Sequence, residues 1–156
     1  MTAKNIIMSL LNTSADIADK ISLWTKTSTE YKMIFNGWMI PTITADSYKK
    51  NSAASSETDL ITNGQLEPNV LFNTINFYRE TSINGFLPHI EADYSINCRA
   101  YTQSDSEAIA AAVNTALNRM SGQGYSIICT IEAAIPPADK TDNYNTRVTA
   151  KIKTTE

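Results

Sequence analysis

Histidine and glycine are scarce in this 156-residue sequence, and each shortage argues against a class of functional site. The single histidine, His89, has no cysteine or second histidine at ligand spacing, which argues against a zinc site or a catalytic triad. The five glycines form no phosphate-binding loop, because Gly122 and Gly124 follow the expected helix instead of preceding it. A Gly-x-Ser-x-Gly nucleophile motif is also missing. We therefore expect no catalytic residue, no metal and no cofactor.

Positive charge and long apolar runs are missing as well. The net charge is −3 and the isoelectric point is near 5.2, so we expect no basic surface for free nucleic acid. No segment approaches the length of about 18 apolar residues that a membrane span requires. Residues 1–4 do not lead into the apolar run of a secretory signal. The sequence thus predicts a protein without membrane contact that stays in the cytoplasm or in a particle assembled there.

Only two cysteines occur, Cys98 and Cys129, and both stand at apolar positions of expected strands. Free cysteine is among the most frequently buried residue types, so we predict two reduced, buried thiols. A disulfide between neighbouring strands is the alternative, and it would require a demanding geometry.

The first half of the chain alternates between short periodic segments and polar ones. Residues 3–23 have helical apolar spacing that is interrupted at 12–14, and Ser14 is a credible N-cap for a second short helix. The segment 30–40 is an expected strand with a hairpin turn at Asn36-Gly37. A strand is also expected at 69–80, after a long polar segment that shows no periodicity.

The second half carries the clearest pattern. A strand is expected at 89–102, with apolar residues at every second position, and further strands at 124–136 and 146–154. A helix is expected at 105–121, with a capping box formed by Ser104 and Glu107. Its packing face is formed by Ile109, Val113, Leu117 and Met120. These elements predict one α+β domain over 1–156, in which a mixed or antiparallel sheet carries one long helix and a short helical N-terminus.

Two rows of charged residues stand on the polar faces of the expected strands. We reject Glu91 and Asp93 as a catalytic pair, because they share no apolar pocket that would separate their pKa values. The basic row on the last strand either protects a sheet edge from aggregation or faces acids on a neighbouring subunit. The residues that we predict at or near subunit boundaries are Glu91, Asp93, Arg99, Arg147, Lys151 and Lys153.

Residues 42–68 form the longest segment without a periodic apolar face. The segment is too polar to fold alone, yet it carries scattered large side chains that a partner would hold in place. We predict a docking loop that becomes ordered on assembly. Its expected docking residues are Tyr48, Lys49, Lys50, Leu60, Ile61 and Leu66.

The order of these pieces resembles the tail terminator, or tail completion, proteins of long-tailed bacteriophages. The resemblance rests on the Gly-Phe-Leu-Pro approach at 85–88, the strand segment Tyr94–Tyr101, and the run Ser104–Val113 that continues to Leu117. It implies a homo-oligomeric ring, usually a hexamer, at the head-tail junction of a virion assembled in the host cytoplasm. Such a ring caps the tail tube protein, ends its polymerisation and joins the tube to the head-side connector or stopper protein. DNA passes through the lumen without specific binding.

Two other interpretations are consistent with the sequence. The chain could be another neck protein, such as a stopper or an adaptor. It could also be a small dimeric α+β module that binds a ligand. A ring protein should behave as a large species in solution, whereas a ligand-binding module should contain an apolar pocket with converging polar groups.

Overall fold

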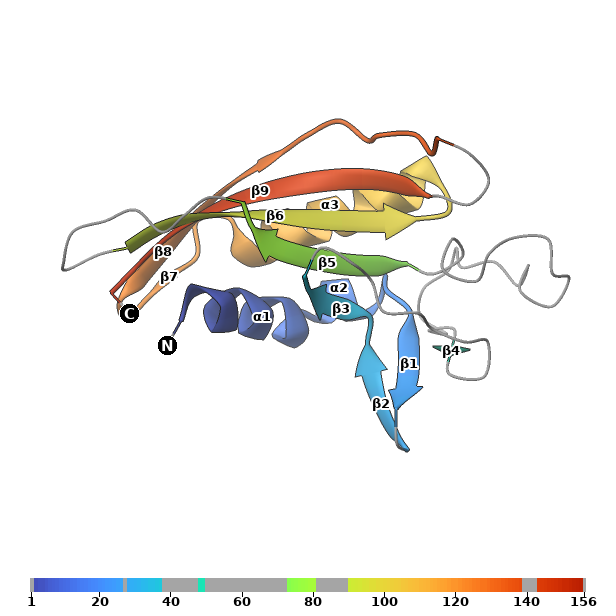
Figure 1. The fold of residues 1–156 in the computed structure, drawn as a ribbon, viewed down its shortest axis with the longest axis horizontal. Helices are drawn as coiled ribbons and strands as arrows, with labels where there is room; N and C mark the ends of the chain where they lie inside the picture. The colour runs from blue at the N-terminus through green and yellow to red at the C-terminus, as the bar shows by residue number, and fades with distance from the viewer. Residues whose placement is uncertain are drawn as a thin grey trace, which may run out of the picture.

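The largest element of the computed structural model is a six-stranded sheet with the strand order β3-β5-β6-β9-β8-β7 (Figure 1). The structure describes residues 2–26, 28–37, 48–49, 73–80, 90–138 and 143–155. The strands of the sheet are β3 (Ile34–Asn36), β5 (Thr74–Arg79), β6 (Ile90–Ala100), β7 (Ser121–Gly122), β8 (Tyr125–Ile131) and β9 (Tyr144–Thr154). All neighbouring pairs are antiparallel except β3 and β5, which are parallel. The predicted mixed sheet is therefore confirmed.

The long alternating strand and the last strand form the centre of this sheet. β6 pairs with β9 over its whole length, from Ile90 opposite Thr154 to Ala100 opposite Tyr144. Every second residue of each strand faces the helices, and Ile96, Cys98, Val148 and Ala150 are fully buried there. The alternation predicted for 89–102 and 146–154 is thus correct, because one buried face fixes the register of a strand.

Helix α3 (Gln103–Leu117) lies across β6, β9 and β8, as predicted for the long helix. Ile109, Val113 and Leu117 are buried in this contact. The predicted N-cap, Ser104, was wrong by two residues. The N-cap is Thr102, whose Oγ1 accepts the Asp105 N–H at 3.2 Å, so the helix starts earlier. Met120 lies beyond the helix end and is 37% exposed, so its predicted place on the packing face was also wrong.

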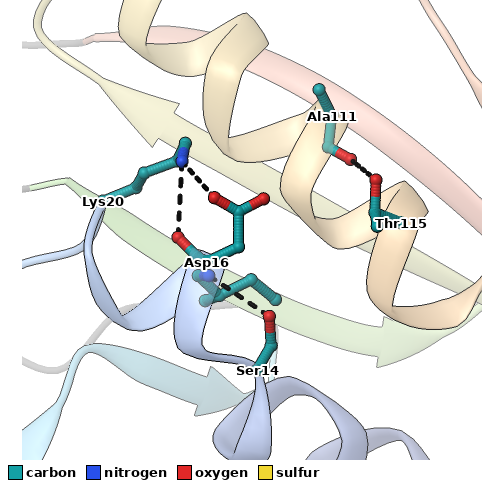
Figure 2. Close-up of polar contacts among 6 residues, drawn as sticks. Ser14, Asp16, Lys20, Ala111 and Thr115 are labelled. Carbon is teal, nitrogen blue, oxygen red and sulfur yellow. Dashed lines mark hydrogen bonds and ion pairs between the residues drawn. The ribbon is translucent and has the colours of Figure 1, made fainter.

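The N-terminal helices α1 (Ala3–Thr13) and α2 (Ala15–Ala18) lie on the same side of the sheet as α3. Ser14 caps α2 as predicted: its Oγ accepts the Ile17 N–H at 3.2 Å, and Lys20 forms an ion pair with Asp16 on the next turn (Figure 2). The apolar residues that α1 and α2 contribute to the shared core are Ala3, Ile6, Ile7, Leu11 and Ile17.

A second, three-stranded sheet with the order β2-β1-β4 was not predicted. It contains β1 (Leu23–Lys26), β2 (Thr29–Lys32) and β4 (Tyr48–Lys49). The predicted strand 30–40 is divided at Met33, whose N–H donates to Ser22 while its carbonyl accepts from Ile75. The chain therefore leaves one sheet at Met33 and enters the other. Residues 38–40, the second half of the predicted Asn36-Gly37 hairpin, lie outside the described residues.

Both cysteines are free, and strand β9 lies between the strands that carry them. Reduced thiols were the main prediction, and the alternative of a disulfide between neighbouring strands is excluded because β6 and β8 are not neighbours. Burial raises the pKa of Cys129 to about 11 and raises the pKa of Cys98 as well. Both thiols therefore remain protonated in the folded protein at neutral pH.

We expect a water-soluble disulfide reagent at about pH 8 to label neither thiol in the folded protein and both in guanidinium chloride. Above about pH 9, the ordinary thiol value, the unfolded chain loses protons that the folded chain retains. The free energy of unfolding should therefore fall as the pH rises through this range. The absorbance of the thiol that the reagent releases measures the labelling. Thermal unfolding at several pH values measures the change in the free energy of unfolding. Rapid labelling of native Cys98 would contradict its burial.

Candidate functional site

The sheet face opposite the helices is the first candidate for a functional surface. It is formed by the alternate residues of β6 and β9 that do not enter the core, and we call it the open face. Its residues on these strands are Glu91, Asp93, Ser95, Asn97, Arg99, Asn145, Arg147, Thr149, Lys151 and Lys153. All six residues predicted at subunit boundaries therefore lie together on this face. Whether a neighbouring subunit contacts them stays a prediction.

The two charged rows of the open face lie opposite each other within the chain. Lys153 Nζ is 2.9 Å from Glu91 Oε1, and Lys151 is the cross-strand partner of Asp93. One of the two sequence interpretations placed the complementary acids on a neighbouring subunit; the structure places acids on the adjacent strand, and a contact with a neighbouring subunit stays a prediction. The other interpretation, edge protection, is excluded because β9 is an internal strand between β6 and β8.

Arg147 connects strands on both sides of its own. Its Nη2 is 2.8 Å from Glu132 Oε2, just after β8, and its Nη1 is 3.5 Å from Glu80 Oε1, just after β5. The hydrogen bond with Glu132 and the charges of Glu132 and Glu80 raise the pKa of Arg147. Because β6 lies between β9 and β5, the pair with Glu80 crosses over β6. This guanidinium thus links the ends of two strands over the open face.

Small polar residues fill the part of the open face between these charges. Asn97 and Asn76 are buried, and each accepts a hydrogen bond at its side-chain oxygen: from Asn145 Nδ2 at 2.9 Å and from Arg99 Nε at 3.2 Å, respectively. Asn76 also donates from Nδ2 to the carbonyl of Gly37 at 3.1 Å. Buried amides are stable when they are paired in this way. This part of the face is therefore a hydrogen-bonded framework.

Strand β8 and its continuation carry exposed isoleucines that the sequence interpretation missed: Ile128 and Ile135 lie on the open face, and Ile131, opposite Val148, lies on the helix side. Ile128, Ile131 and Ile135 are 66%, 47% and 51% exposed, respectively. Between the pairs Ile131–Val148 and Ile135–Asn145, β8 and its continuation have three residues where β9 has two. This bulge reverses the alternation, so Ile135 lies on the open face and not in the core row predicted for 124–136. The neighbouring pair Ile127-Ile128 was the signal, since adjacent residues of a strand point to opposite faces.

The outer edge of β8 is only partly paired. The backbone of Ile127 bonds with Met120 and Arg119, and the Cys129 N–H donates to Asn118 Oδ1 at 2.9 Å. Because the backbone groups of alternate residues point the same way, those of Ile131 also face outward. No described residue pairs with them. We call Ile128, Ile131, Ile135 and this backbone segment the β8 edge surface.

The predicted docking loop is described only in part. Tyr48 and Lys49 form β4, whose backbone pairs with Trp24 and Leu23 of β1. The remaining predicted docking residues lie outside the described residues, as does His89. They are Lys50, Leu60, Ile61 and Leu66.

Within the described ranges, His, Cys, Asp and Glu form no group of three that could hold a metal ion. Among the same residues, no helix is both long enough and apolar enough to cross a membrane. Comparison of the chain with protein-family models, with curated proteins and with solved structures gave no match.

Proposed function

We propose that the protein is a structural subunit of a bacteriophage virion. In this proposal it forms a ring at the head-tail junction that caps the tail tube, ends its polymerisation and joins it to the head connector. The sequence pattern over 70–120 supports this function through its resemblance to tail terminator proteins. The α+β fold, with α3 lying across the sheet, agrees with the layout that the resemblance implies.

The β8 edge surface is the observation that carries the proposal of self-association. An exposed strand edge is normally protected by charged residues or proline, but Tyr125–Ile131 contains neither. Exposed isoleucines on both faces of a strand, beside unpaired backbone groups at its edge, are typical of an edge that a second chain covers.

A ring also requires two different contact surfaces on each subunit, because its contacts run head to tail. Figure 1 shows the β1–β2 hairpin projecting from the side of the molecule opposite to β8. The β1–β2 hairpin and the β8 edge surface are therefore two different candidate contact surfaces on opposite sides of the molecule. The net charge of −3 suits a lumen through which DNA passes without being retained.

Light scattering coupled to size exclusion tests the ring. We expect a species several times the 17.2 kDa mass of the chain, with six copies as the leading stoichiometry. Ile128→Lys combined with Ile131→Lys places two charges in the contact and should give monomers with an unchanged circular dichroism spectrum. Ala111→Lys combined with Thr115→Lys is the matched control, because both residues are exposed on α3, outside the β8 edge surface, and this pair should leave the assembly intact. If the wild-type protein were a monomer both in solution and in particles, the proposed ring would be excluded. A dimer would instead favour the ligand-binding module.

Electron microscopy of tails assembled with and without the chain tests the position in the virion. Tubes that lack the cap should vary in length and should fail to join heads. Tails of uniform length that join heads normally in its absence would exclude a terminator role and leave the other neck functions.

A further inference from the structure

A hollow of about 510 Å³ opens on the helix side of the sheet, away from the β8 edge surface. Its wall combines the first turn of α1, the end of β3, the end of β5 and the middle of β6. Its described lining residues include Lys4, Asn5, Asn36, Arg79 and Tyr94. We propose that this hollow binds a small organic molecule that carries a phosphate group.

Two cations from distant parts of the sequence meet at the hollow, and none of the described residues that line it is acidic. Lys20, Arg147 and Lys153 each form an ion pair with a carboxylate. Lys4 and Arg79 form none within the described residues. In a protein with a net charge of −3, two uncompensated cations at one hollow make a local positive potential that attracts an anion.

The position of each cation is unfavourable for the stability of its own element. Lys4 lies in the first turn of α1, where the helix dipole disfavours positive charge and no acidic residue offsets it. Arg79 stands opposite the buried Tyr94, on the sheet face that packs against the helices, yet it remains exposed. Residues that break a local rule without a structural gain are expected at functional sites.

The remaining lining groups determine the class of ligand. Asn5 and Asn36 supply amide donors, and Tyr94 supplies ring surface with a hydroxyl group. A guanidinium and an ammonium together match the two charges of a phosphate monoester better than the single charge of a carboxylate. The volume suits a ligand of mononucleotide size, since small-molecule sites span roughly 300–1,000 Å³.

Isothermal titration of the full chain with inorganic phosphate, ribose 5-phosphate and acetate tests the site at an ionic strength of about 0.15 M. We expect ribose 5-phosphate to bind most tightly, followed by phosphate, with acetate at least about tenfold weaker. Lys4→Gln and Arg79→Gln should each weaken phosphate binding by about tenfold. Lys153→Gln removes the same charge from the open face and should change the affinity by less than about twofold.

Equal weakening by Lys153→Gln and Arg79→Gln would show a general charge effect and overturn the site, as would the absence of phosphate binding at about 10 mM. Equal affinity for phosphate and acetate would overturn the assignment of the ligand class. The titration does not depend on the ring, because the Ile128→Lys, Ile131→Lys monomer retains the hollow and should bind equally well.

Discussion

Val113→Asp should prevent the chain from folding into a stable domain. Val113 is fully buried in the middle of α3, where that helix packs against the sheet. A carboxylate at this position would lose its hydration without gaining an ionic partner, which costs roughly 3–5 kcal/mol. That is a large part of the stability of an ordinary domain. Thermal unfolding followed by circular dichroism measures the loss.

Ala111→Asp is the matched control for this substitution, because Ala111 is exposed on the same helix. The control changes the net charge in the same way and lowers helix propensity more, because alanine is the best helix former, but it places the carboxylate in water. It should shift the midpoint of unfolding only slightly. If the two variants were equally stable, the packing face of α3 would be assigned incorrectly.

Ser106→Ala should produce the second-largest loss of stability. Ser106 Oγ lies 2.7 Å from the carbonyl oxygen of Cys98 and 2.8 Å from Thr146 Oγ1, all within the buried contact between α3 and the sheet. The substitution leaves both oxygens without this partner, which costs about 1–3 kcal/mol. Urea unfolding should show a lower midpoint with an unchanged slope.

A double-mutant cycle isolates the hydroxyl pair. Thr146→Val removes the second hydroxyl at nearly constant shape, so the double variant should be more stable than the sum of the single losses predicts. Ser104→Ala serves as the control, since Ser104 is exposed and stands two residues before Ser106 in the same helix. Strict additivity of Ser106→Ala and Thr146→Val would show that the two hydroxyls do not interact.

The elements that the sequence predicted well are those with one buried face and an uninterrupted period. The sequence of β6 alternates apolar and polar residues without a break from Ile90 to Ala100, and α3 repeats its buried residues from Ile109 to Leu117. Burial of such a face is a large energy that overrides local propensity. For this reason the class of the fold could be predicted without knowledge of the topology.

The features that the sequence did not predict depend on contacts between distant residues. The division at Met33 is set by backbone bonds to Ser22 and Ile75, and neither partner leaves a mark in the local pattern. The pairing of the charged rows required the register of β6 against β9, which alternation alone does not supply. The six residues predicted at a subunit boundary lie on one face, where acids of β6 face the basic row of β9, and their place at a boundary stays a prediction.

The place of β9 in the sheet has a consequence for the order of events during synthesis. β6 and β8 are made before β9, yet β9 is the strand that joins them. Until it arrives, both strands present unpaired edges, and the apolar rows of β6, α3 and β8 have no complete core. Strand insertion between earlier strands depends on long-range contacts, which form slowly. A growing chain that has completed β8 but not β9 is therefore the form most exposed to aggregation, and the one that a chaperone would bind.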